Sequence, residues 1–313
     1  MTYSSGGLIQ ATDYNNFAGG AAANVSGQLN SVLATGRGNS GYGQTAVANV
    51  NASTDIVTAA QWTTLVNGIN LVRKHQSGAG FSNIGTYTAG ATVNAVTDIL
   101  GNINTAYSNR LSYTAQGSTV TGATFSPNFT LAATTAAQTF SFTRACTFSS
   151  GDAARWFFNA GGQLNFVFIS GTNNDGTTRS ADLITLAVTN LGSKKVGFQD
   201  WTARTGTGGT LNTDLTFGYG YYAQSTSNLT VCQITATAYT YTGDNIKLYG
   251  STNGVQGSNA DNGSVFNFSV DLTSAAKSNF YNNSINITLN HRVDIIYPET
   301  TYLTNSWGTV TIT

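Results

Sequence analysis

Residues 139–148, Thr-Phe-Ser-Phe-Thr-Arg-Ala-Cys-Thr-Phe, decide the fold class. Apolar side chains recur here at every second position or nearly so, namely Phe140, Phe142, Cys146 and Phe148. A period of two is typical of a β-strand that buries one face and exposes the other. The chain before residue 115 has a helical period instead. The sequence therefore predicts an α+β protein in which a helical N-terminal part precedes a β-rich part.

The β-rich part is predicted to span residues 116–313. Residues 115–130 are expected to form a linker or an entry strand, and strands are predicted at 229–241, 265–272 and 285–296. Residues 155–158 and 164–169 flank Asn-Ala-Gly-Gly, which predicts a β-hairpin with a glycine turn. One short helix is expected at 181–191, ending at Gly192. Many strands with frequent turns favour an antiparallel β-sandwich or jelly roll.

The helical part, residues 1–115, contains three apolar stripes with steps of three and four. The first runs from Phe17 to Leu33 through Ala21 and Val25, with Thr12 or Asp13 as its cap. The second is expected to begin at Thr58, where Gln61 completes a capping box, and to end before Gly78. The third stripe runs from residue 93 to 111. We expect a small helical domain that serves attachment or oligomerisation.

The charge content limits the function. Charged residues make up 8% of the chain, its 13 basic and 13 acidic residues cancel, and Glu299 is its single glutamate. Nucleic acids and anionic membranes select a basic excess, so neither is expected as a partner. No apolar run reaches the roughly 20 residues of a membrane span, and no signal peptide is expected at the N-terminus. The two cysteines, Cys146 and Cys232, lie in strand-like runs, which favours buried thiols over a disulfide.

The residues that could carry chemistry are few and scattered. Gly36 to Gly41 match G-x-G-x-x-G, but they follow a helical stripe and no βαβ unit is visible, so an ordered turn is the better interpretation than a nucleotide site. His75 and His291 have no ligand partner at helical or strand spacing. The aspartates, such as Asp175 and Asp244, lie in turn contexts. We therefore expect a protein that is not an enzyme and has no cofactor or metal.

One aromatic cluster, Phe-Gly-Tyr-Gly-Tyr-Tyr at 217–222, has glycines around its rings. Tyr219, Tyr221 and Tyr222 are predicted to be exposed, as contacts for another protein or for a glycan. The alternative is an ordinary strand that buries one aromatic face.

A resemblance rests on three strings. Residues 36–44 (GRGNSGYGQ) precede residues 56–62 (IVTAAQW), and residues 154–162 read ARWFFNAGG. Together they resemble virion proteins of tailed bacteriophages, particularly large contractile-tailed marine phages. In those proteins a G-x-G-x-x-G-Y-G-Q loop precedes a T-A-x-x-W-x-x-L helix. The present chain departs from them in having Arg37 and Asn39 where neutral and acidic residues are expected.

The resemblance implies a structural component of the virion, made in the host cytoplasm and placed in the tail or neck as part of a fibre, collar or baseplate. Its partners would be copies of itself and other virion proteins. A capsid decoration protein and a receptor-binding adhesin that recognises a host surface glycan are the alternatives. The candidate site is the ordered glycine-rich loop, whose residues of interest are Gly36, Gly38, Gly41, Tyr42, Gly43 and Gln44.

Overall fold

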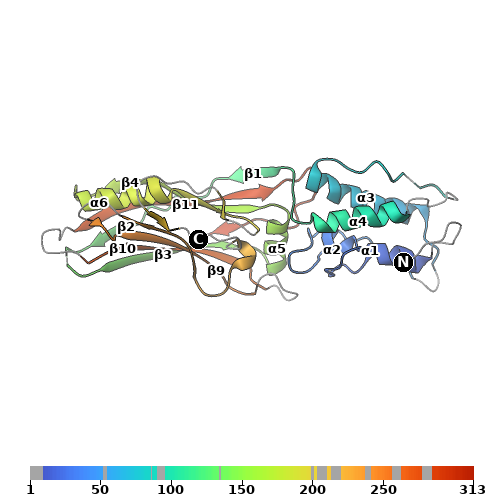
Figure 1. Cartoon of the computed structure of the whole chain (residues 1–313), viewed down its shortest axis with the longest axis horizontal. Coiled ribbons are helices and arrows are strands. Elements are labelled where there is room, and N and C mark those ends of the chain that lie inside the picture. The colour runs from blue at the N-terminus through green and yellow to red at the C-terminus, as the bar shows by residue number, and fades with distance from the viewer. Residues whose placement is uncertain are drawn as a thin grey trace.

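The computed structural model describes residues 10–51, 55–85, 87–89, 96–133, 135–198, 201–202, 210–212, 220–236, 241–255, 262–276 and 284–313. The molecule is elongated, with the first four helices at one end and two β-sheets at the other (Figure 1). The predicted α+β class is confirmed. The division into domains 1–115 and 116–313 stays a prediction, because the buried apolar side chains of both ends form one continuous cluster.

The helical end contains α1 (Ala11–Ala18), α2 (Asn30–Leu33), α3 (Ala59–Ser77) and α4 (Val96–Ser108). Helix α3 begins as predicted. The Gln61 amide donates to Thr58 Oγ1 at 3.3 Å, and the Thr58 amide donates to Gln61 Oε1 at 2.7 Å. Gly78 ends the helix with a φ of 73°, which a glycine adopts without steric cost.

The first predicted helix is wrong. Its stripe is split into α1 and α2, because Gly19 ends α1 with a φ of 73° and the chain turns there. Ala21 and Val25, which the stripe placed on the buried face, are exposed. The predicted cap is also corrected: Gln10 precedes the helix, and Asp13 accepts a hydrogen bond from the Gln10 amide at 2.9 Å.

The β end is an antiparallel sandwich of two sheets. The first sheet has the order β1-β11-β4-β5-β6, and β2 also pairs with β11. Its strands are β1 (Gln116–Val120), β2 (Asn128–Leu131), β4 (Gln163–Asn173), β5 (Ser193–Val196), β6 (Trp201–Thr202) and β11 (Ile285–Pro298). The expected entry strand at 115–130 thus corresponds to β1 and β2, which line the edge of β11.

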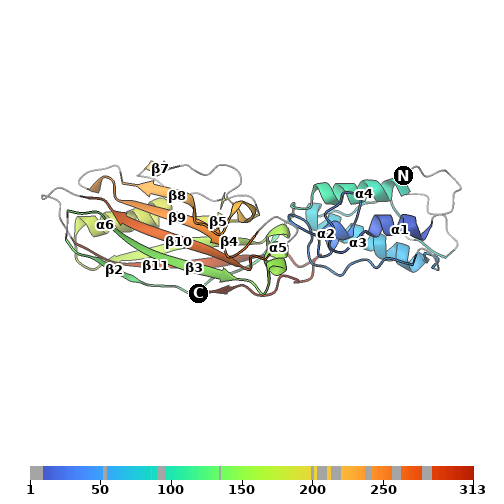
Figure 2. The same cartoon turned by 90° about the horizontal axis from the view of Figure 1, so that it is seen from below.

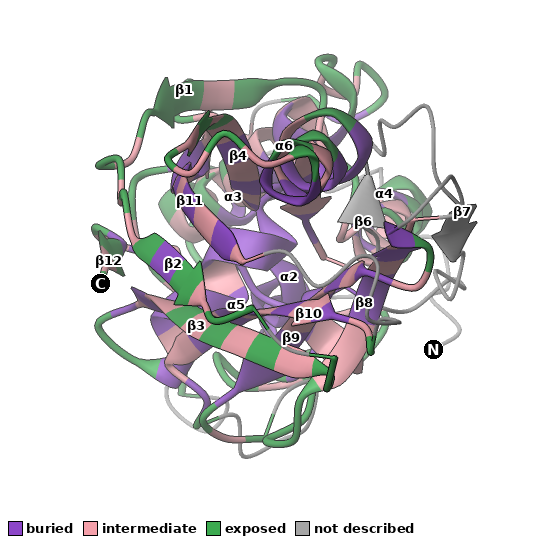
Figure 3. Cartoon of the chain, turned by 90° about the vertical axis from the view of Figure 1, so that its left-hand side faces the viewer, coloured by how far each residue is buried: buried purple, intermediate pink, exposed green. Residues whose placement is uncertain are grey.

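The second sheet has the order β12-β3-β10-β9-β8-β7 (Figure 2). Its strands are β3 (Gln138–Thr147), β7 (Thr210–Asn212), β8 (Leu229–Thr235), β9 (Asn245–Thr252), β10 (Val265–Ser274) and β12 (Thr311–Ile312). The alternation that predicts β3 is present: exposed Thr139, Ser141 and Thr143 alternate with less exposed phenylalanines (Figure 3). The last part of the strand predicted at 229–241 includes residues 237–240, which lie outside the described residues.

The predicted hairpin at 155–169 is wrong in its first half. Residues 151–159 form helix α5 (Gly151–Asn159), and β4 follows it without a partner hairpin strand. Ser150 caps the helix by accepting from the Ala153 amide at 3.0 Å, and Asp152 lies in the first turn, where a negative charge suits the helix dipole. Phe157 and Phe158 are buried by helical rather than strand geometry.

Helix α6 (Thr178–Thr185) continues into the π-helical turn η1 (Leu186–Leu191), and Gly192 follows with a φ of 60°. The short helix is thus confirmed, although it begins three residues before the predicted start. Asp175 occupies a turn as expected, since its carboxylate accepts from the Thr177 amide at 3.1 Å. Asp244 also closes a turn, since its amide donates to the Tyr241 carbonyl at 3.0 Å. Its side chain is buried at 1% exposure, with Oδ2 3.5 Å from Arg179 Nε.

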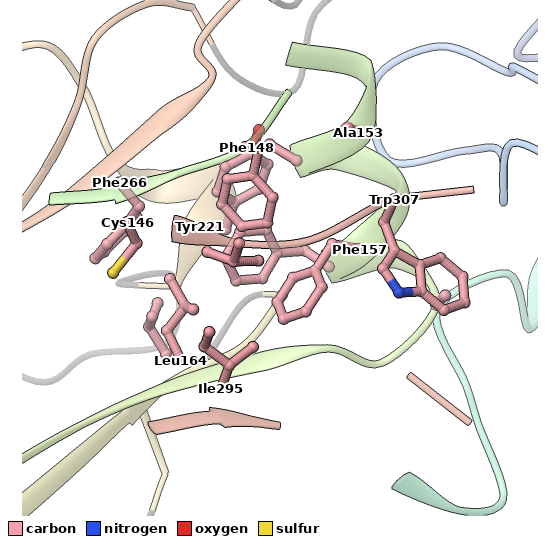
Figure 4. Packing of buried hydrophobic residues seen from close by; sticks show 14 of the residues in the cluster. Cys146, Phe148, Ala153, Phe157, Leu164, Tyr221, Phe266, Ile295 and Trp307 are labelled. Atoms are coloured by element: carbon pink, nitrogen blue, oxygen red, sulfur yellow. The ribbon is translucent and has the colours of Figure 1, made fainter. Parts of the chain in front are cut away.

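Aromatic rings fill the end of the sandwich that faces the helices. Phe157 projects from α5 into the same cluster as Phe148, Tyr221 and Trp307 (Figure 4). The Phe158 and Tyr221 rings are stacked with their centroids 4.1 Å apart. Cys146 and Cys232 are buried free thiols, so the disulfide alternative is excluded.

Candidate functional site

The glycine-rich loop, residues 36–44, lies at the junction between the helical end and the sandwich. Gly36, Gly38, Gly41 and Gly43 all have positive φ values, between 55° and 96°. The loop therefore adopts a backbone path that other residues would follow only with strain. A Cβ atom at Gly41 would lie 2.2 Å from the Thr35 carbonyl oxygen, so that position also lacks room for a side chain.

Five amide groups of the loop, those of residues 36, 40, 42, 43 and 44, donate hydrogen bonds within the chain. The Gly36 amide donates to the Ala21 carbonyl at 2.8 Å. The amides of residues 42, 43 and 44 donate, each at 2.9 Å, to carbonyls of Val32, Ala34 and Leu33. A phosphate cradle needs free amides at the start of a helix. This loop follows helix α2 and leads into extended chain, so its geometry is that of an ordered turn.

Helix α5 holds the loop from the sandwich side. The Arg155 guanidinium, on a residue that is 1% exposed, donates to the Ser40 carbonyl at 2.5 Å and to Asp152 Oδ1 at 2.6 Å. Asn159 Nδ2 donates to the Gly41 carbonyl at 3.1 Å. Trp156 Nε1 donates to the Thr35 carbonyl at 3.1 Å. One helix of the β end thus satisfies three carbonyls in or beside the loop.

Close packing accompanies these bonds. A Cβ atom at Gly43 would lie 2.4 Å from Trp156 Cδ2, so the indole ring of α5 fills the space that a side chain at 43 would need. The Tyr222 hydroxyl lies 2.9 Å from both the Gly38 carbonyl and Asn159 Oδ1. It links the loop, helix α5 and the 3-10 turn η2 (Tyr221–Ala223) at one point.

The segment that precedes β12 completes the junction. Gln44 Nε2 donates to the Thr304 carbonyl at 3.0 Å, and the Thr304 amide donates back to Gln44 Oε1 at 2.9 Å. Ser306 Oγ donates to the Tyr42 carbonyl at 2.6 Å. The loop therefore contacts two parts of the β end that are far apart in sequence.

On its other side the loop inserts Tyr42 into the helical core. Tyr42 is 0% exposed, and its hydroxyl accepts from Gln76 Nε2 at 3.1 Å. Burial raises the pKa of Tyr42 above its ordinary value. His75 packs edge-on against this ring at 5.1 Å, and burial lowers the pKa of His75 to about 4. Both groups are neutral near pH 7, which suits a structural contact.

The predicted aromatic contacts have different positions. Tyr221 is 1% exposed and belongs to the core, which corrects the expectation that it lies at the surface. Tyr222 is half-buried and contacts the glycine-rich loop of the same chain. Tyr219 lies outside the described residues. The alternative, an ordinary strand that buries one aromatic face, holds for the burial of Tyr221 but not for the strand, since Tyr221 lies in the 3-10 turn η2.

The six loop residues named from the sequence meet partners that the sequence did not indicate. Arg155, Asn159, Thr304 and Ser306 contribute side-chain or backbone groups to the junction. For Arg155 and Asn159 a signal existed, because Ser150 and Asp152 mark a helix start that would place both residues on one side of α5. For Thr304 and Ser306 no local pattern exists, since the contact joins residues about 260 positions apart.

The chemistry of the junction is that of neutral hydrogen bonds around one buried guanidinium. In the described part of the chain, no three His, Cys, Asp or Glu side chains are grouped to hold a metal ion. None of the described helices is long and apolar enough to cross a membrane. Comparison with protein-family models, with curated proteins and with solved structures gave no match. Conclusions about function therefore rest on the chain's own residues.

Proposed function

We propose that this chain is a non-enzymatic structural protein of a phage virion, built into the tail or neck as a fibre, collar or baseplate component. The observation that carries the proposal is the junction. It joins a helical end to a β-sandwich through buried hydrogen bonds from Arg155 and Asn159 and a half-buried one from Tyr222. Such a junction fixes the relative position of the two ends, which is what a load-transmitting subunit requires.

The outer face of the second sheet supports the same proposal. Thr139 and Thr273 hydroxyls lie 3.0 Å apart, and those of Thr143 and Ser269 lie 2.8 Å apart. Hydroxyl groups lose less free energy than ions when they are transferred from water into an interface. A surface of this kind suits contacts with neighbouring subunits in an assembly.

The experiment is mass spectrometry of purified virions together with localisation of the chain in a cryo-electron microscopy map. The proposal expects the protein in washed particles, at the tail or neck. Its absence from particles would overturn the proposal. Hundreds of copies on the head lattice would favour the decoration protein instead.

The alternative, a receptor-binding adhesin, has its own test, which is binding to a host glycan. Tyr221 is in the core and Tyr222 contacts the loop, so neither is free for a glycan, and Tyr219 lies outside the described residues. Among the described residues, Tyr249 on the outer face of β9 is an aromatic candidate. Its hydroxyl donates to Asp271 Oδ2 at 3.0 Å. Host-polysaccharide binding that Tyr249→Ala removes would favour the adhesin over the tail component.

A further inference from the structure

Strand β3 has an open edge. Within the part of the chain that the structure describes, residues 138–144 pair with β10 on one side and have no strand on the other. Strand β12 covers only the following positions, where Ala145 and Thr313 exchange both backbone hydrogen bonds, at 2.9 Å and 3.0 Å. In an antiparallel ladder, backbone groups of alternate residues point to the same side. The amides and carbonyls of Thr139, Ser141 and Thr143 therefore point outward from this edge, as those of Ala145 do.

This edge lacks most of the usual protection against pairing. Natural edge strands carry lysine, proline, a bulge or a covering loop. Residues 138–143 contain no charge and no proline, and the register with β10 runs from Ser274 to Val265 without a shift. Arg144 follows: its Nε donates to His291 Nε2 at 2.8 Å, and its guanidinium lies 3.9 Å from the Phe125 ring centroid. Its Nη1 donates to the Thr143 carbonyl at 3.1 Å, so a pairing strand would have to displace this one side-chain bond.

The burial of the inward-facing side chains changes along the strand. Cys146, beside β12, is 0% exposed. Phe140 and Phe142 point to the same inner side of β3 but are only half-buried. Both face the first sheet, where the Phe129 ring centroid lies 3.9 Å from that of Phe140. The packing is thus complete where an outer strand is present and incomplete where it is absent.

We propose that residues 138–144 of β3 pair with the same residues of a second copy of this chain, antiparallel and centred on Ser141. This edge-to-edge pairing would join the second sheets of two copies into one continuous sheet. The register follows from β12, which limits the open edge to residues 138–144 in both copies. A two-fold axis then places Ser141 opposite Ser141 and Thr139 opposite Thr143 of the other copy.

A second copy of the chain is the partner we infer for this edge, because the edge is complementary to itself. The pairing places hydroxyl side chains opposite hydroxyl side chains and brings no like charges together. The chain has 13 basic and 13 acidic residues, so two copies do not repel each other through net charge. The proposal rests on β3 alone and holds whatever the protein's place in a virion.

The test uses single cysteines in the full-length protein. Ser141 pairs with itself in a hydrogen-bonded position, where Cα atoms are about 5.5 Å apart, a distance that a disulfide spans. Ser141→Cys is therefore expected to form a disulfide-linked dimer under mild oxidation. Thr139→Cys, on the same face of the same strand, is the matched control and should stay unlinked alone. A mixture of Thr139→Cys with Thr143→Cys should link, because these residues oppose each other.

Sedimentation of the unmodified protein gives a second measurement. We expect a reversible dimer, and Ser141→Pro should weaken it about tenfold or more, because proline removes one amide per copy from the new ladder. A monomeric unmodified protein, an unlinked Ser141→Cys, or equal linking by Thr139→Cys alone would each overturn the proposal. If Ser141→Pro fails to fold, the cysteine variants still decide, since they retain every backbone amide. These results on purified protein are independent of virion mass spectrometry.

Discussion

The buried guanidinium of Arg155 donates a hydrogen bond to the backbone carbonyl of Ser40, 115 residues earlier in the chain, at 2.5 Å. This bond joins helix α5 of the sandwich end to the glycine-rich loop of the helical end. A cation is well suited to the position, because a charged donor forms a stronger hydrogen bond with a carbonyl than a neutral one does. The partner charge, Asp152, has a side chain that is 47% exposed, so the pair is solvated at one side.

Arg155→Met is expected to destabilise the protein. The substitution leaves the Ser40 carbonyl without this donor while it keeps a long apolar side chain in place. Hydrogen bonds to charged groups contribute roughly 1.5–3 kcal/mol, so the free energy of unfolding should fall by about 2 kcal/mol in urea titrations. Asp152→Asn is the control: because the Asp152 carboxylate is exposed, its loss should lower the free energy of unfolding by less than about 1 kcal/mol. Equal losses for both variants would contradict the role assigned to the buried bond.

Gly43→Ala should be costly for two separable reasons. Gly43 has a φ of 68°, and the added Cβ would lie 2.4 Å from Trp156 Cδ2. Gly176 has a similar φ of 70° but no atom within 4 Å of the added Cβ. Gly176→Ala should therefore lower the free energy of unfolding by only the cost of the left-handed backbone conformation, about 1–2 kcal/mol. Gly43→Ala should lose roughly 1–3 kcal/mol more by thermal or urea unfolding, from overpacking against the indole.

The histidines predict a pH dependence of stability. Burial, reinforced by the nearby Arg144 cation, lowers the pKa of His291 from 6.5 to about 4. The unfolded chain therefore binds a proton that the folded chain does not, at every pH between these values. The contribution of His291 to the free energy of unfolding is fully present above pH 6.5. It decreases as the pH falls toward 4, by up to about 3 kcal/mol.

Urea unfolding at pH 7 and at pH 5 measures this effect. His291→Gln keeps an acceptor for the Arg144 guanidinium but cannot titrate, so its stability should depend less on pH than that of the unmodified protein. His75, whose pKa burial also lowers to about 4, continues to contribute in the variant. A pH dependence that is unchanged in His291→Gln would show that His291 does not titrate as predicted.

The two thiols should be unreactive in the folded protein. Cys146 and Cys232 are both 0% exposed, and burial raises the pKa of the Cys146 thiol. The thiolate is the reactive form, so a disulfide-exchange reagent should label neither residue in buffer and both in guanidinium chloride. Rapid labelling of the folded protein would contradict the burial of these residues. The same measurement provides the background for cysteines introduced into β3.

The sequence predicted elements whose signals are local. The capping box of Thr58 and Gln61 marked the start of α3, and the alternation around Phe140 marked β3, because a strand or helix buries one face at a fixed period. The errors occurred where a local feature was misweighed. Gly19 interrupts the stripe through Phe17. The turn after Asn159 is present, with a φ of 96° at Gly161, but a strand was predicted for residues 155–158 before it, although Ser150 begins a helix.

The junction could be predicted in part. The glycine-rich loop stands out by its composition, and four of its glycines adopt positive φ values. Its partners could not be predicted, because no local pattern connects Gln44 with Thr304. Tyr221 shows the same limit: its ring is buried by stacking on Phe158, a contact that depends on the packing of separate elements.

The bonds between Gln44 and Thr304 have a consequence for biosynthesis. A ribosome delivers the chain from the N-terminus, and parts of a protein that emerge early can fold before the rest is made. The glycine-rich loop emerges about 260 residues before Thr304 and Ser306, which complete its hydrogen bonding. The loop of the helical end therefore lacks these hydrogen-bond partners until nearly all of the sandwich has been translated. Completion of the junction is expected to be among the last steps of folding in each newly made subunit.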